Sequence, residues 1–218
     1  MTSAVSVVLC VRNGEAYIRD ALDSIAAQNM ENIETIVVDD GSEDQTAELA
    51  RAHRVGAQVI NRPPLGVPAA LNAGVDAASK ELIAFLDADD VWPSTRLGEM
   101  VRFLDSNPSV EIVYGQMVNT DQSLRHKHAP FPARHLTCSV LRRSALAAVG
   151  PFRTDVVHAS NVDWMSRAFA MKIPMAQLEA LVLLRRVHGE NMGVRDATRG
   201  RRDLLRVIRD HRARSMHG

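Results

Sequence analysis

The sequence predicts an α/β protein with a mostly parallel sheet flanked by helices. Three observations carry this prediction. Short apolar runs alternate with stretches of helical periodicity in the first half of the chain, which is the pattern of right-handed βαβ units. The run Leu82–Leu86 is apolar throughout, as expected of a strand buried on both faces. It ends in Asp87, Asp89 and Asp90, and ligands of α/β sheets bind outside the carboxyl ends of the strands.

Four strands and three helices are expected in the first half. Apolar residues at helical spacing predict each helix, and Asp44 is a candidate N-cap for the second one. Turn signals such as Asn13-Gly14 separate the elements. The expected strands are Val5–Leu9, Glu34–Val38, Val59–Ile60 and Leu82–Leu86, with helices after Asn13-Gly14, after Asp44 and over Val67–Ala78.

The second half is expected to continue with a helix from Ser94 that carries an apolar stripe. A polar loop over Asn119–Arg134 contains His126 and His128. This pair could be a metal site, but a solvated loop is favoured because no further ligand is nearby in the sequence. Further strands are expected at Glu111–Met117, Thr137–Leu141 and Leu181–Leu184, with helices over Arg142–Val149 and from Asp163 onward.

Composition excludes several classes of protein. The 218 residues are 46% hydrophobic and suit one domain with a sizeable core. A net charge of +0 gives no general case for nucleic-acid binding. No apolar run approaches the ~20 residues of a membrane span, and the first residues lack the features of a signal peptide. Cys10 and Cys138 have no metal-ligand spacing, so a reducing, cytoplasmic location is expected.

The sequence also lacks both common glycine-rich phosphate motifs. No G-x-G-x-x-G follows the first strand, and no G-x-x-x-x-G-K-[ST] occurs anywhere. A bound nucleotide would therefore be held by carboxylates and a metal. Carboxylates as close as Asp87, Asp89 and Asp90 repel one another unless a cation compensates them, and a divalent metal holding a diphosphate would do so. The alternative is a solvated acidic turn before the helix from Ser94.

Several segments, in this order and spacing, resemble the family-2 glycosyltransferases of the GT-A fold. That family moves a sugar from a nucleotide-sugar donor to an acceptor nucleophile, usually with Mg²⁺ or Mn²⁺. The resemblance covers about the first hundred residues, and its combination of motifs is more specific than any single one. The segments are Val5–Gly14, Tyr17, Ser24, Gln28, Val37–Ser42, Ala70–Gly74 and Ile83–Trp92.

The resemblance implies roles for individual residues of the donor site. Asp40 would accept a hydrogen bond from the base, typically uracil, and Asp87 would contact the ribose. Asp89 would bind the metal that bridges the diphosphate, and Asp90 would support this pair or approach the donor sugar. Arg12 departs from the family pattern and leaves the base preference open. The implied nucleotide-sugar-binding residues are Cys10, Val11, Arg12, Asn13, Asp40, Asn72, Asp87, Ala88 and Asp90, with Asn72 equally compatible with a structural role.

Two further residues are assigned by resemblance in the second half. The family's catalytic acid lies in an acidic pair at a helix start, which makes Asp163 the predicted base, although Val162 replaces the first acid of the pair. The alternative for Asp163 is an acid favoured by the helix dipole. His188 lies in a segment that resembles the family's Arg-x-His-x-x-Asn, as a third metal ligand or a structural histidine. A histidine beside a carboxylate suits Mn²⁺ at least as well as Mg²⁺.

The resemblance therefore implies one GT-A domain over residues 1–194, with a nucleotide-binding half (about 1–107) and a smaller acceptor and catalytic half (about 108–194). An arginine-rich helix over 195–218 would follow, packed on the domain with a solvated face; docking to anionic lipid or a partner is the less favoured alternative. The expected function is metal-dependent, inverting transfer from a UDP-sugar to an acceptor glycan, lipid-linked glycan, small metabolite or peptide. The alternatives are a nucleotidyltransferase and a catalytically silent nucleotide-sugar-binding protein.

Overall fold

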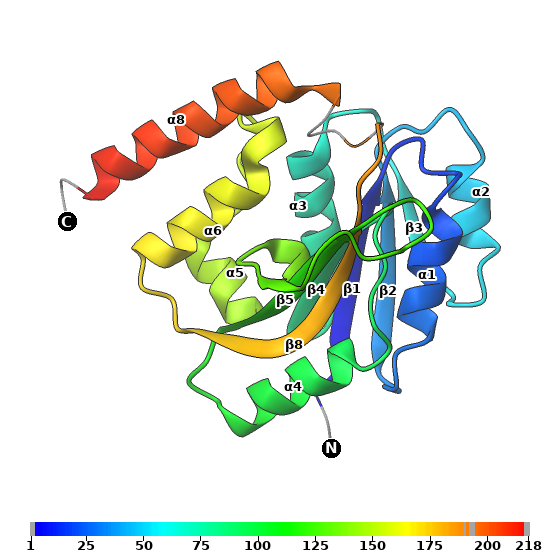
Figure 1. Ribbon diagram of the computed structural model, residues 1–218, viewed down its shortest axis with the longest axis horizontal. Helices are drawn as coiled ribbons and strands as arrows, with labels where there is room; N and C mark the ends of the chain where they lie inside the picture. Colours follow the sequence, from blue (N-terminus) through cyan, green and yellow to red (C-terminus); the bar gives the residue numbers. More distant parts are fainter. Residues whose placement is uncertain (1–2, 190, 192–194, 216–218) are drawn as a thin grey trace.

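A computed structural model of the protein describes residues 3–189, 191 and 195–215. It contains one eight-stranded sheet with the strand order β3-β2-β1-β4-β7-β5-β6, and β8 pairs with β5. Helices flank this sheet (Figure 1). The predicted α/β fold is thus confirmed. Two points of the predicted domain bounds cannot be compared with the structure. Residue 194, its predicted end, and residues 1–2 lie outside the described part of the chain.

The first half forms the parallel part of the sheet. Strands β1, β2, β3 and β4 pair in parallel with one another, and the carboxyl ends of β1, β2 and β4 therefore lie at one edge. Their register places Cys10 opposite both Val38 and Asp87. The bounds are β1 Val5–Val11, α1 Ile18–Ala26, β2 Ile33–Asp39, α2 Thr46–Arg51, β3 Gln58–Asn61, α3 Val67–Ala77, β4 Leu82–Asp87 and α4 Arg96–Ser106.

The second half extends the same sheet. β7 is antiparallel to both β4 and β5, which makes the sheet mixed on this side. Two short 3₁₀ helices, η1 and η2, precede β7 and α6. The bounds are β5 Ile112–Thr120, β6 Phe131–Pro132, η1 Leu136–Cys138, β7 Ser139–Arg142, α5 Arg143–Val149, η2 Val157–Ala159, α6 Ser160–Ala170, β8 Met175–Arg186 and α8 Ala197–Ser215.

Strand β8 is three times as long as expected, because it pairs along β5 from Ile112 to Thr120. The ladder shifts register beside Gly115. A Cβ at Gly115 would lie 2.6 Å from Val182 Cγ1 and 2.8 Å from the Ala180 carbonyl oxygen, so only glycine lets the two strands approach this closely.

The sheet is buried on both faces in its parallel part. Alternate residues of β4 enter two different apolar clusters, with Leu82 and Leu86 in one and Ile83 and Phe85 in the other. The first cluster includes the apolar stripes of α1 and α4, and the second includes those of α3, α5 and α6. A continuous apolar run such as Leu82–Leu86 is the expected sequence of a strand with two buried faces.

Helix α8 lies outside the two layers of helices, across α6 and η2 (Figure 1). Its Val207 is buried against Val156 and Ala159. Within the described residues, no helix is both long enough and apolar enough to cross a membrane.

Candidate functional site

Three acids meet where β4 ends. One carboxylate oxygen from each of Asp87, Asp89 and Asp90 lies within 4.8 Å of the others. The turn is closed by the Asp90 amide, which donates to the Asp87 carbonyl at 3.1 Å. Asp90 is buried, and its Oδ1 accepts a hydrogen bond of 2.9 Å from the Arg186 amide. The strand therefore delivers the predicted carboxylates to one point.

The electrostatics of this cluster favour a cation. Desolvation by the surrounding protein and then the charge of Asp89 raise the pKa of Asp87 to about 7; because Asp87 is exposed to solvent, water screens both effects. Burial and the charges of the other two acids raise the pKa of Asp90 well above its ordinary value. The positive charge of the Arg185 guanidinium offsets only part of the rise in these two pKa values. The cluster thus carries negative charge that its protein neighbours do not balance.

The fourth group at this point is His188. Its buried side chain places Nε2 3.2 Å from Asp89 Oδ2. The side-chain Nδ2 of Asn191 donates to the same oxygen at 2.7 Å, and Asn191 Oδ1 accepts from the His188 backbone amide at 2.6 Å. The ring of Tyr17 stacks on the imidazole at 4.7 Å between centroids. The structure therefore brings Asp89 and His188 together from distant parts of the chain.

Two residues of this site were not predicted from the sequence. Asn191 orients both His188 and Asp89, and Arg186 joins the site to α1. The buried Arg186 guanidinium donates to Asp20 at 2.9 Å and lies 5.0 Å from the centre of the Tyr17 ring. The sequence signal for both residues was their place in the segment around His188. Their hydrogen-bond partners, Asp89 and Asp20, are so distant in sequence that no local pattern could reveal them.

The predicted base-recognition residue, Asp40, is buried just after the end of β2, which β1 separates from β4 in the sheet. Its two oxygens accept hydrogen bonds from the amides of Leu65 at 3.1 Å and Gly66 at 2.8 Å, and Arg62 Nε lies 3.8 Å away. An ionised carboxylate has about four acceptor positions, so Asp40 retains capacity for a ligand. Cys10 is half-buried between these strand ends. Burial, followed by the charges of Asp87 and Asp40, raises the pKa of its thiol.

The loop after β1 is tied to the loop after β2. The Asn13 amide donates to Ser42 Oγ at 2.9 Å, and Asn13 Oδ1 accepts from the Glu43 amide at 2.9 Å. Asn13 has a positive φ of 52°, which asparagine tolerates. Asp44 lies one residue before Gln45, the N-cap residue of α2. Its carboxylate accepts from the amide of Thr46, the first residue of the helix, and from that of Glu15, both at 3.1 Å.

The remaining donor-site candidates differ in their surroundings. Val11 is buried, Ala88 is half-buried inside the acidic turn, and Arg12 is exposed. Asn72 uses its amide on the backbone of Phe152, donating to the carbonyl at 2.9 Å and accepting from the amide at 2.8 Å. This is the structural alternative for Asn72, because both ends of its side chain are engaged away from the acidic cluster.

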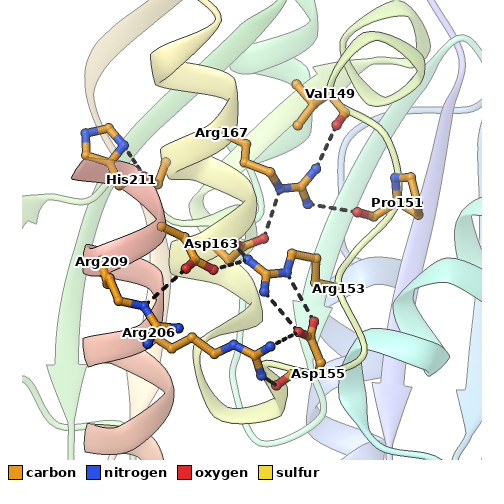
Figure 2. A network of polar contacts seen from close by, with 11 residues as sticks. Val149, Pro151, Arg153, Asp155, Asp163, Arg167, Arg206, Arg209 and His211 are labelled. Atoms are coloured by element: carbon orange, nitrogen blue, oxygen red, sulfur yellow. Dashed lines mark hydrogen bonds and ion pairs between the residues drawn. The ribbon is translucent and has the colours of Figure 1, made fainter. Parts of the chain in front are cut away.

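Asp163 lies in the first turn of α6 and has an exposed fraction of 0%. Figure 2 shows it between two guanidinium groups: Arg167 Nε donates to Oδ2 at 2.9 Å, and Arg153 Nη1 donates to Oδ1 at 3.3 Å. Arg167 also donates to the carbonyls of Val149 and Pro151, at 2.7 and 2.8 Å. A general base must reach the proton that it abstracts. In this conformation the predicted base, Asp163, is therefore part of a buried ion pair that fastens α6 and is out of reach of solvent.

The chain resembles curated glycosyltransferases over part of their length. EpsH of Bacillus subtilis strain 168, provisionally named a glycosyltransferase, is 42% identical over 92 residues, which are 41% of this chain and 27% of EpsH. An uncharacterized glycosyltransferase of Haemophilus influenzae is 34% identical over 110 residues, which are 49% of this chain and 34% of that protein. The chain thus spans about a third or less of the length of these relatives.

Solved structures share the fold. Staphylococcus aureus TarS (residues 1–349, in complex with UDP) superposes with a TM-score of 0.78 at 19% identity, over 97% of this chain and 65% of TarS. The mannosyltransferase PcManGT of Pyrobaculum calidifontis, in complex with GDP-Man and Mn²⁺, gives a TM-score of 0.76 at 21% identity, over 100% of this chain and 65% of PcManGT. Residues 6–160, which are most of the chain, match the sequence profile of glycosyl transferase family 2. The chain therefore belongs to glycosyl transferase family 2.

Proposed function

We propose that the chain is a metal-dependent, inverting glycosyltransferase that uses a nucleoside-diphosphate sugar, with a UDP-sugar as the expected donor. The observation that carries the proposal is the convergence of three carboxylates and one imidazole at the end of β4. TarS has been solved with UDP and with UDP-GlcNAc, and PcManGT with GDP-Man and Mn²⁺. These donors share a diphosphate, which is the group that an acidic site would hold through a metal.

The residues present fit a divalent cation. The raised pKa values of Asp87 and Asp90 reflect desolvation and the repulsion between neighbouring acids, both of which a bound cation would offset. His188 adds a nitrogen donor beside Asp89. Asp89 and His188 would hold Mn²⁺ or Mg²⁺, with Asp90 supporting the turn and Asp87 facing the ribose. When bound, such an ion neutralises charge on the departing nucleoside diphosphate.

The neighbouring strand ends would hold the nucleotide. Asp40 would accept from the base, and the donor would lie along the segment from Cys10 to Asn13 and against Ala88. Inversion requires the acceptor hydroxyl to attack from the face opposite the diphosphate. Because Asp163 is buried between Arg153 and Arg167, we assign it to the positioning of α6 and not to proton transfer.

The acceptor half would lie within residues 108–194, and the acceptor would be a glycan, a lipid-linked glycan, a small metabolite or a peptide side chain. We propose a cytoplasmic location, where the free cysteines Cys10 and Cys138 stay reduced.

The test is calorimetric titration with a panel of nucleoside diphosphates, with and without Mn²⁺. Metal-dependent binding of one nucleotide is expected, and Asp89→Asn should abolish it. Asp76→Asn is the charge-matched control, because Asp76 is exposed near the far end of α3. Absence of binding to every nucleotide would refute the proposal. Pyrophosphate release from a nucleoside triphosphate would indicate a nucleotidyltransferase, and donor binding without transfer or hydrolysis would indicate a silent binding protein.

A further inference from the structure

The solvent-facing side of α8 combines apolar and cationic residues. We call Arg201, Leu204, Leu205, Ile208 and Arg209 the outer face. Leu204, Leu205 and Ile208 are 40%, 68% and 41% exposed, and both arginines are exposed as well. Residues three and four apart are neighbours on a helix, so these five side chains form one continuous patch with its leucines and isoleucine between the arginines.

The acids of α8 point the other way, toward the domain. Asp203 Oδ2 accepts from the His158 amide at 2.9 Å. Asp210 Oδ2 accepts from Arg153 Nη1 at 2.7 Å. Within the described part of the chain, Arg209 is the one residue of the outer face that lies near either of these acids, 3.7 Å from Asp210, which also binds Arg153. The outer face is therefore net cationic.

Exposed apolar side chains also lie on the part of α6 that borders α8. Ser166 Oγ lies 2.9 Å from His211 Nδ1, so this stripe of α6 borders α8. Val162 and Phe169 lie one turn before and one turn after Ser166 on the same stripe, and they are 46% and 59% exposed. Large exposed apolar side chains grouped in this way mark interaction surfaces more often than scattered ones do.

We propose that the outer face docks α8 on the surface of an anionic lipid bilayer, with the helix axis in the plane of the interface. Arginines of such a helix bind the lipid phosphates, while its leucine and isoleucine side chains enter the boundary of the acyl chains. A bilayer surface offers anions and an apolar medium together. This inference is independent of the nucleotide site and of the activity proposed for it.

Other occupants fit the outer face less well. A second copy packed through a two-fold axis would set Arg201 and Arg209 against the same arginines of its partner, at a cost in like-charge repulsion. A nucleic acid or an acidic peptide would pair with the arginines but leave Leu205 and Ile208 in water. These occupants are outcomes that the experiment separates.

The experiment is co-sedimentation of the full chain with phosphatidylcholine vesicles, with and without phosphatidylglycerol. Binding is expected only to the anionic vesicles. Arg201→Gln with Arg209→Gln should lower the partition coefficient by about tenfold or more. Leu205→Ser with Ile208→Ser should lower it by about tenfold, because the removed apolar groups no longer enter the bilayer.

The matched control pair is Arg19→Gln with Arg102→Gln, which removes two exposed arginines from α1 and α4. This pair should bind as the parent does, and thermal melts of all variants check that each is folded. The proposal is overturned if the parent does not bind anionic vesicles, or if the control pair loses as much binding as the outer-face pair. It is also overturned if the serine variant binds the vesicles as the parent does, because charge attraction alone would then explain binding. Loss of a gel-filtration dimer in the serine variant would likewise overturn it, in favour of a second copy of the chain as the occupant.

Discussion

His188 Nε2 lies 3.2 Å from Asp89 Oδ2, although 99 positions separate the two residues. Backbone pairing fixes this contact: the amides of Val91 and Leu184 donate to each other's carbonyls, at 3.1 and 2.9 Å. The turn after β4 and the end of β8 are therefore held side by side by backbone hydrogen bonds. The proposed metal site would thus be organised by the fold itself, which favours binding because little ordering remains to be done.

His188→Ala is expected to weaken Mn²⁺-dependent nucleotide binding by about tenfold or more, because removal of a ligand or of the group that orients one has effects of this order. Calorimetric titration measures the change. His126→Ala is the control, since His126 lies in the exposed loop after β5. Equal losses in the two variants would show that His188 is a structural histidine.

The metal-free protein should lose stability between pH 4 and pH 7 through Asp87. Its pKa is raised from 3.8 to about 7 in the folded state, so the unfolded chain releases this proton at a lower pH. The free energy of unfolding then falls as pH rises from about 4 to about 7, and Asp87 adds no further slope above that range. Asp87→Asn should remove this part of the slope. Urea denaturation of both proteins across this range measures it, and parallel curves would contradict the assignment.

Asp163→Asn is expected to destabilise the fold by about 3 kcal/mol, because one carboxylate charge would no longer compensate two guanidinium groups at a buried site. Asp155→Asn is the matched control. Asp155 binds the same Arg153 at 2.9 Å, but its side chain is 46% exposed, and exposed pairs contribute about 1 kcal/mol or less. Urea denaturation compares the two.

Donor binding by folded Asp163→Asn should equal that of the parent. If the variant kept full stability and lost all sugar transfer, Asp163 would be the base after all, in a conformation with its two ion pairs open.

The sequence was most informative where one apolar run specified one element. The strands of the parallel half and the acids at their ends follow from such runs, since a strand with two buried faces consists mostly of apolar residues. Strand β8 was predicted too short because Gln177 and Glu179 interrupt its apolar pattern, and its first part is defined by pairing with β5.

Side-chain partners distant in sequence were the part that could not be predicted. Asn72 bonds to Phe152, which lies 80 positions away. Asp163 is 10 positions from Arg153, which also binds Asp210. Local sequence shows which residues are polar, but tertiary packing decides which of them are buried and therefore whether a carboxylate is a base or half of an ion pair.

Gly74→Ala tests how tightly α3 packs on the sheet. Helix propensity alone predicts that alanine in this helix would stabilise the protein by up to about 1 kcal/mol. A Cβ at Gly74, however, would overlap Val8 Cγ1 and lie 3.3 Å from Val38 Cγ2. We expect this overlap to prevail, with a net loss of about 1–3 kcal/mol measured by urea denaturation.

Gly200→Ala in α8 is the control, because a Cβ there would make only an ordinary contact of 3.8 Å with His158 Cβ, and this variant should gain stability. Val8→Ala removes the atom that Gly74→Ala would overlap, so the double variant should be less unstable than the sum of the two single ones. Additive losses would mean that α3 shifts away from β1 instead, and that close packing at Gly74 does not hold the helix in place.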